Sequence, residues 1–121
     1  RAAIPMALVS ASSRPLVDAA LTSIGHGYFD ITISDNDVEN SKPDPEGYLK
    51  AADWLGANIE STLIIEDSIT GMNAAIASGA YVLGIPHVAD LPSGHKVIHH
   101  STLQGLTLAH LSELFSPLYA R

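Results

Sequence analysis

The chain has 121 residues, 46% of them hydrophobic, and a formal net charge of −7 at pH 7. This is the size of one ordinary domain, with enough apolar content to bury a core, and the absence of cysteine excludes disulfides, thiolate metal sites and a cysteine nucleophile. The acidic charge leaves no basic stripe for nucleic acid, and no apolar run reaches the roughly 20 residues that cross a bilayer. We therefore expect a cytoplasmic protein that acts on neither nucleic acid nor membrane.

Apolar runs of strand length alternate along the chain with segments of helical periodicity. This alternation predicts an α/β fold in three layers, a Rossmann-like parallel sheet with helices on both faces, formed by residues 1–121 as one domain. The predicted strands are Met6–Ser10, Asp30–Ser34, Thr62–Ile65, Ala80–Ile85 and a short Lys96–Ile98. The predicted helices are Arg14–Ile24, one opened by Asp44 as its N-cap and ended by Gly56, one from Ile69 to a stop at Gly79, and a closing helix around Leu108–Phe115.

The hydrophobic pattern also predicts where two of the strands lie in the sheet. Asp30–Ser34 alternates apolar and polar residues, as an edge strand with one drier face does. Thr62–Ile65 is apolar on both faces and is predicted to be central.

Candidate site residues follow the predicted strands, because ligands of parallel α/β sheets collect at the carboxyl ends of the strands. Glu66 and Asp67 come directly after a buried strand, where two neighbouring carboxylates favour a hard cation between them. Mg²⁺ takes one or two carboxylates together with water and substrate phosphate. The alternative is that Asp67 or Ser68 only caps the next helix.

Two other strand ends offer groups that suit a phosphoryl group. Ser10 has a hydroxyl, and Ala11 and Ser12 have backbone N–H groups at a predicted helix start. Lys42, one of only six cationic residues, lies in a polar loop and could neutralise phosphoryl charge. The alternatives are a serine cluster that caps the helix and a lysine that is simply solvated.

The histidines give a weaker signal. His95, His99 and His100 are close in sequence, but they have neither a helical register nor a paired carboxylate, so we interpret them as solvated surface residues rather than metal ligands. His87 follows the fourth long strand and could lie at the rim of the site.

Taken together, three segments resemble motifs of the haloacid dehalogenase superfamily, in its sugar-phosphate phosphatase and β-phosphoglucomutase-like branch. Leu8–Ser12 resembles the second family motif, Ser41–Pro45 the third, and Ile64–Ser68 with Gly71 the fourth. The resemblance implies that Ser10 binds the transferring phosphate with the backbone of Ala11 and Ser12, that Lys42 pairs with phosphate and nucleophile, and that Glu66 and Asp67 hold Mg²⁺. Asp67 would be the stronger ligand.

The family's first motif, Asp-x-Asp-x-Thr or Val, which supplies the aspartate nucleophile, does not occur in these 121 residues. The nearest pattern, Asp35-Asn36-Asp37, follows an edge strand after the second motif, and we interpret it as a polar turn. By resemblance, the first motif and the substrate-selecting cap lie upstream of Arg1, and the first motif's strand lies between Met6–Ser10 and Thr62–Ile65. The isolated chain is then expected to be inactive and to associate with its N-terminal portion or with another copy.

The expected activity is Mg²⁺-dependent phosphomonoester hydrolysis of a small phosphorylated metabolite through an aspartyl-phosphate. A phosphomutase of the same family and a non-catalytic binding domain are the alternatives. A phosphorylation-controlled receiver module also combines an acidic pair, a hydroxyl and a lysine, but it has its acidic pair first and its lysine last, the reverse of the order found here.

Overall fold

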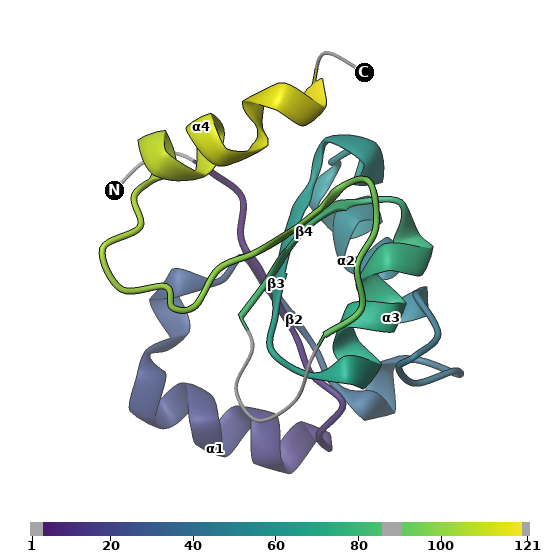
Figure 1. The fold of residues 1–121 in the computed structure, drawn as a ribbon. Helices are drawn as coiled ribbons and strands as arrows, with labels where there is room; N and C mark the ends of the chain where they lie inside the picture. Colours follow the sequence, from purple (N-terminus) through teal and green to yellow (C-terminus); the bar gives the residue numbers. More distant parts are fainter. Residues whose placement is uncertain (1–3, 86–90, 120–121) are drawn as a thin grey trace.

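A computed structural model describes residues 4–85 and 91–119, which form two parallel sheets flanked by helices (Figure 1). The first sheet pairs β1 (Ala7–Val9) with β2 (Ile31–Ile33), and the second has the order β3-β4-β5, with strands Leu63–Glu66, Tyr81–Gly84 and Val97–His99. Every pairing is parallel; Ala7 lies opposite Ile31, Leu63 opposite Tyr81, and Val82 opposite Val97. The predicted α/β architecture is confirmed.

The helices cover the sheets from two sides. In Figure 1, α2 and α3 lie together on one side and α1 and α4 on the other, which gives the predicted three layers. The α-helices are α1 (Arg14–Ile24), α2 (Glu46–Leu55), α3 (Ile69–Ser78) and α4 (Leu108–Tyr119), and the short 3-10 helices are η1 (His26–Tyr28), η2 (Asp35–Asp37) and η3 (Ile59–Ser61).

The core lies around β4 and the helices packed on it. Met72, Val82 and Leu83 are 0% exposed. The ring of Phe115 on α4 meets Tyr81 edge to face at 5.8 Å between centroids, a geometry that adds to the apolar area that the pair buries. This contact fastens the last helix to the second sheet.

Helix ends agree closely with the sequence pattern. Gly56 and Gly79 follow α2 and α3 with φ of 69° and 90°, left-handed conformations that glycine adopts without steric cost. At the start of α2 the prediction is one residue off: the helix begins at Glu46 with Pro45 as N-cap, while the Asp44 side chain still accepts the Glu46 N–H at 2.9 Å.

The outer face of α2 leaves Trp54, the only tryptophan of the chain, 62% exposed.

The strand predicted at Thr62–Ile65 has a neighbour on one side only in this structure. Within the described residues β3 pairs only with β4, and the Ile65 side chain is 45% exposed. β2 pairs only with β1, as predicted for an edge strand, and no pairing joins β1 to β3 in the part of the chain that the structure describes.

No helix among these residues combines the length and apolar character needed to span a membrane.

Candidate functional site

Lys42 links the carboxyl ends of the two sheets. Its Nζ donates to the Val9 carbonyl oxygen, at the end of β1, at 3.1 Å, and to Glu66 Oε2, at the end of β3, at 2.7 Å. The side chains of the ion pair are only 13% and 10% exposed. The structure thus brings the loop lysine and the first member of the acidic pair into direct contact, between two strands that do not pair with each other.

Tyr48, on α2, is a third member of this group. The residue is 7% exposed, its hydroxyl donates to Glu66 Oε2, and Lys42 Nζ lies 4.9 Å from the ring centroid. Burial, the hydrogen bond to Glu66, and the charges of Glu66 and Asp67 raise the pKa of Tyr48 well above its ordinary value. The phenol therefore stays protonated and acts as a fixed hydrogen-bond donor.

Tyr48 is not among the site residues that the sequence predicts. The available signal was a tyrosine on an otherwise apolar helix face, since a buried phenol needs a hydrogen-bond partner.

Ser10 and Ala11 lie with Lys42 on the wall of one small hollow. Its lining residues are Val9, Ser10, Ala11, Ile33, Ser34, Asp35, Val38, Asn40, Ser41, Lys42 and Gly47. Ser10 does not cap α1: its hydroxyl accepts the Ser12 N–H at 3.1 Å, and the N-cap residue Ser13 makes no side-chain cap bond. The first-turn N–H of Arg14 is instead satisfied by Asn36 Oδ1 at 2.7 Å. The capping alternative for the serine cluster is therefore not what the structure shows.

Glu66, Asp67 and Ser68 follow one another at the end of β3 and make different contacts. Ser68 caps α3 by accepting the Gly71 N–H at 3.0 Å, so Asp67 is not needed for that task and lies exposed. The Glu66 carboxylate packs so closely over Gly71 that a Cβ there would overlap it. Gly71 thus lets the carboxylate fold back over the helix start.

This donor set suits Mg²⁺ in its chemistry. Two carboxylates with water and phosphate make up the usual sphere of that ion, and Asp67 is exposed, whereas one Glu66 oxygen already accepts hydrogen bonds from Lys42 and Tyr48. No three His, Asp or Glu side chains gather as a metal site within residues 4–85 and 91–119. Asp67 is thus the better placed of the two predicted ligands.

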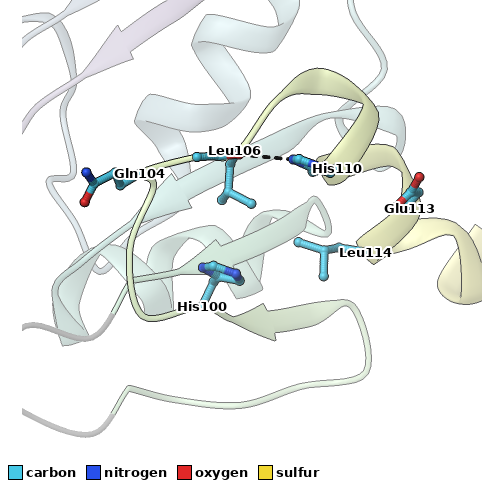
Figure 2. A pocket seen from close by; sticks show the side chains of 7 residues that line it. His100, Gln104, Leu106, His110, Glu113 and Leu114 are labelled. Atoms are coloured by element: carbon cyan, nitrogen blue, oxygen red, sulfur yellow. Dashed lines mark hydrogen bonds between the residues drawn. The ribbon is translucent and has the colours of Figure 1, made fainter.

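A second hollow, of about 410 Å³, lies beside α4 and contains none of the predicted site residues (Figure 2). His100 and His110 line it, and the Nδ1 atom of each contacts a backbone oxygen, that of Thr102 at 2.7 Å and of Gly105 at 3.1 Å. His99 Nε2 contacts the Pro92 oxygen at 2.9 Å. His87 lies outside the described residues.

The parallel α/β fold, with polar side chains gathered at the carboxyl ends of its strands, places the protein in the class of Rossmann-like α/β proteins. A profile of the haloacid dehalogenase-like hydrolases matches residues 1–85, and the chain belongs to this family. The predicted family is confirmed.

Two curated relatives and one solved structure illustrate the similarity. Validoxylamine A 7'-phosphate phosphatase from Streptomyces hygroscopicus subsp. limoneus is 32% identical over 88 residues, which are 72% of this chain and 41% of that protein. Hexitol phosphatase A from Escherichia coli (strain K12) is 29% identical over 97 residues, 80% of this chain and 45% of the relative. CbbY from Rhodobacter sphaeroides, solved in complex with phosphate, superposes with a TM-score of 0.81 at 26% identity, covering 90% of this chain and 52% of the other. The chain thus spans about half the length of the proteins it matches.

Proposed function

We propose that this chain contributes the phosphate- and Mg²⁺-binding part of a phosphomonoesterase that acts on a small phosphorylated metabolite. The observation that carries the proposal is the position of Lys42, whose ammonium group contacts the end of β1 beside Ser10 and the carboxylate of Glu66. A hydroxyl, a cation and an acidic pair at neighbouring strand ends are the groups that phosphoryl transfer requires.

In this proposal Ser10, Ala11, Ser12 and Lys42 bind the transferring phosphoryl group. The Ser10 hydroxyl and the Ala11 N–H each offer a hydrogen bond to a phosphate oxygen. The Ser12 N–H donates to Ser10 Oγ in this structure. When the Ser10 hydroxyl rotates to bind the phosphoryl group, the Ser12 N–H would donate to a phosphate oxygen instead. Lys42 stabilises the negative charge that the equatorial oxygens carry in the transition state.

Asp67 and Glu66 would hold Mg²⁺, Asp67 as the principal ligand. The bound ion would neutralise charge on the phosphoryl oxygens. Tyr48 and Lys42 fix the Glu66 carboxylate in the orientation seen here.

The nucleophile is proposed to be an aspartate on a strand that lies N-terminal to this chain and inserts between β1 and β3. Each of these strands pairs on one side only in the described part of the chain, and Lys42 lies where an inserted strand would end. The carboxylate attacks phosphorus as the bond to the leaving alcohol oxygen breaks, and water then hydrolyses the aspartyl-phosphate to inorganic phosphate.

Both curated relatives described above are phosphatases by name, which favours hydrolysis over phosphomutase activity. The family match also sets aside the receiver-module alternative. A non-catalytic binding domain remains the competing proposal, and an activity assay separates it from the enzyme.

The test compares the 121-residue chain with a chain extended upstream by an Asp-x-Asp strand and its cap, each assayed on a generic phosphomonoester with and without Mg²⁺. We expect hydrolysis only by the extended chain with Mg²⁺, and a loss of roughly 10²–10³-fold in kcat for Lys42→Met, the scale for removing one charge-stabilising donor. Activity that is independent of Mg²⁺, or that survives Lys42→Met, would contradict the proposal. An inactive extended chain that still binds inorganic phosphate would support the binding domain instead.

A further inference from the structure

The Asp35–Asp37 turn is the sequence pattern that the proposed function leaves unused. It forms the 3-10 helix η2, and its first residue lines the same hollow as Ser10 and Lys42. We propose that Asp35 is a positioning residue, which holds the Ser10–Ser12 loop and the Lys42 loop in their mutual placement. This inference rests on the proposed function, because it names the residue that arranges the phosphate-binding groups.

Asp35 contacts both loops directly. Its backbone N–H donates to the Ser12 carbonyl oxygen at 2.8 Å, and its carboxylate accepts a hydrogen bond from the Ser41 hydroxyl. Ser41 directly precedes Lys42. One residue therefore ties the proposed phosphate loop to the backbone that carries the proposed phosphate cation.

The rest of the turn anchors Asp35 to the surrounding elements. Asn36 Oδ1 accepts the Arg14 N–H at 2.7 Å at the start of α1. Asp37 Oδ2 accepts the N–H and hydroxyl of Ser34 at 2.7 and 2.8 Å and pairs with the Arg14 guanidinium. Lys50, on α2, donates to the Asp37 carbonyl oxygen at 2.5 Å. The turn is thus tied to β2, α1 and α2, so Asp35 has a fixed base from which to hold Ser41.

The Lys42 loop must be held in place, because the lysine side chain has to reach two acceptors on different strands at the same time. Its Nζ reaches the ends of two strands at 3.1 and 2.7 Å, and a misplacement of about 1 Å at a phosphoryl-transfer site can cost about 10²-fold in rate. The loop backbone just before Ser41 is held by Glu46, which accepts the N–H groups of Glu39 and Asn40 at 2.8 and 3.0 Å. Asp35 supplies the last side-chain contact before the lysine.

A positioning role and a nucleophilic role for Asp35 predict different results for its amide analogue. An asparagine keeps the oxygen that accepts the Ser41 hydroxyl but is a poor nucleophile, so Asp35→Asn should preserve a positioning function and abolish a nucleophilic one. Asp35→Ala removes the acceptor in either case. Asp53→Ala is the matched control, since Asp53 is exposed on α2 and its side chain makes no hydrogen bond within the described residues.

The first measurement is the affinity for inorganic phosphate, obtained by titrating the amide signals of Ser10, Ala11 and Lys42 by NMR. We expect Asp35→Ala to weaken binding roughly tenfold, within the range of coupling between contacting groups, while Asp35→Asn and Asp53→Ala stay within about twofold of the parent chain. Equal affinities for Asp35→Ala and the parent, or an Asp35→Asn variant as weak as Asp35→Ala, would overturn the proposal.

The second measurement does not depend on phosphate. The Asp44 N–H donates to the Ser41 carbonyl oxygen at 3.0 Å, so its hydrogen exchange reports the order of the Lys42 loop. We expect faster exchange at Asp44 in Asp35→Ala and parent-like exchange in Asp35→Asn; unchanged exchange in both would overturn the positioning role. If the parent chain fails to bind phosphate while Asp44 exchange still responds to Asp35→Ala, the positioning role stands and the proposed function falls.

Discussion

The buried ion pair of Lys42 and Glu66 makes the stability of the protein sensitive to the loss of either partner. A buried ion pair gains little over an apolar pair, but removal of one partner leaves a desolvated charge behind. We expect Lys42→Met to lower the free energy of unfolding by about 3–5 kcal/mol, because among the described residues the Glu66 carboxylate then keeps only the Tyr48 hydroxyl as a hydrogen-bond donor. Urea unfolding followed by circular dichroism measures this change.

The double variant Lys42→Met with Glu66→Gln is its control. With no unpaired charge left, the double variant should regain much of the loss, so the coupling free energy between the two sites should be large. Equal destabilisation in the single and double variants would show that lost packing, rather than the charge, causes the effect.

Asp37 gives the protein a defined response to acid. The N–H and the hydroxyl of Ser34, and to a lesser degree Arg14, lower the pKa of Asp37 to about 2. Since the folded pKa lies below the unfolded value, the ionised carboxylate contributes its full stability above the unfolded pKa of 3.8, and this contribution is lost as the pH falls through about 2.

We therefore expect the free energy of unfolding of the parent chain to fall more steeply over this acid range than that of Asp37→Asn. The difference between the two curves isolates Asp37 from the other carboxylates. Parallel curves would contradict the assignment, and the Asp37 carboxyl signal in an NMR titration checks the pKa itself.

At the scale of elements, the junction of β3 with α3 depends on the absence of a side chain at position 71. A helical glycine replaced by alanine ordinarily gains about 1 kcal/mol, but a methyl group at Gly71 would displace the Glu66 carboxylate. We expect Gly71→Ala to destabilise the protein by about 1–3 kcal/mol and to reduce the Lys42–Glu66 coupling free energy.

Gly27→Ala is the matched control, since a Cβ at Gly27 meets nothing within 4 Å and its φ is not left-handed. It should change the free energy of unfolding only slightly. A stabilised Gly71→Ala variant would mean that Glu66 relaxes at no cost and that its present orientation is not required.

Element boundaries were predictable where local chemistry decides them. The glycine stops at 56 and 79 depend on one residue's backbone conformation, and the structure confirms them. The neighbours of β3 were not predictable in the same way, because the apolar Thr62–Ile65 pattern carries no direct information on hydrogen bonds to particular strands.

In the candidate site, too, some residues could be predicted from the sequence and others could not. Ser10, Lys42 and Glu66 could be selected because each follows a predicted strand or lies in a polar loop between elements. The contacts of Tyr48 and Asp35 join residues 18 and 6 positions apart. A tyrosine on an apolar helix face indicates that its hydroxyl needs a partner, but the sequence does not identify Glu66 as that partner. The sequence therefore indicated which groups gather, whereas the supports that hold them appeared only in three dimensions.

For the molecule as a whole, β1 and β3 each have one side that pairs with no strand in the described part of the chain, and this predicts uneven local stability. β4 is paired on both sides and its Val82 and Leu83 are 0% exposed, so its amides should exchange slowest. Extension of the chain by the proposed upstream strand should slow exchange in β1 and β3 while leaving β5, on the far side of the second sheet, unchanged. Equal slowing of all strands would indicate a general gain in stability instead of strand insertion.

The exposed indole on α2 decides how unfolding of this protein can be followed. With Trp54 62% exposed, its emission in the native state should already resemble that of a solvated indole. Intrinsic fluorescence would then barely change as the core opens, and a flat trace could be mistaken for resistance to denaturant. Replacing a buried aromatic with an indole, for example Phe115→Trp against the Tyr81 ring, would create a spectroscopic reporter at a position that is 1% exposed.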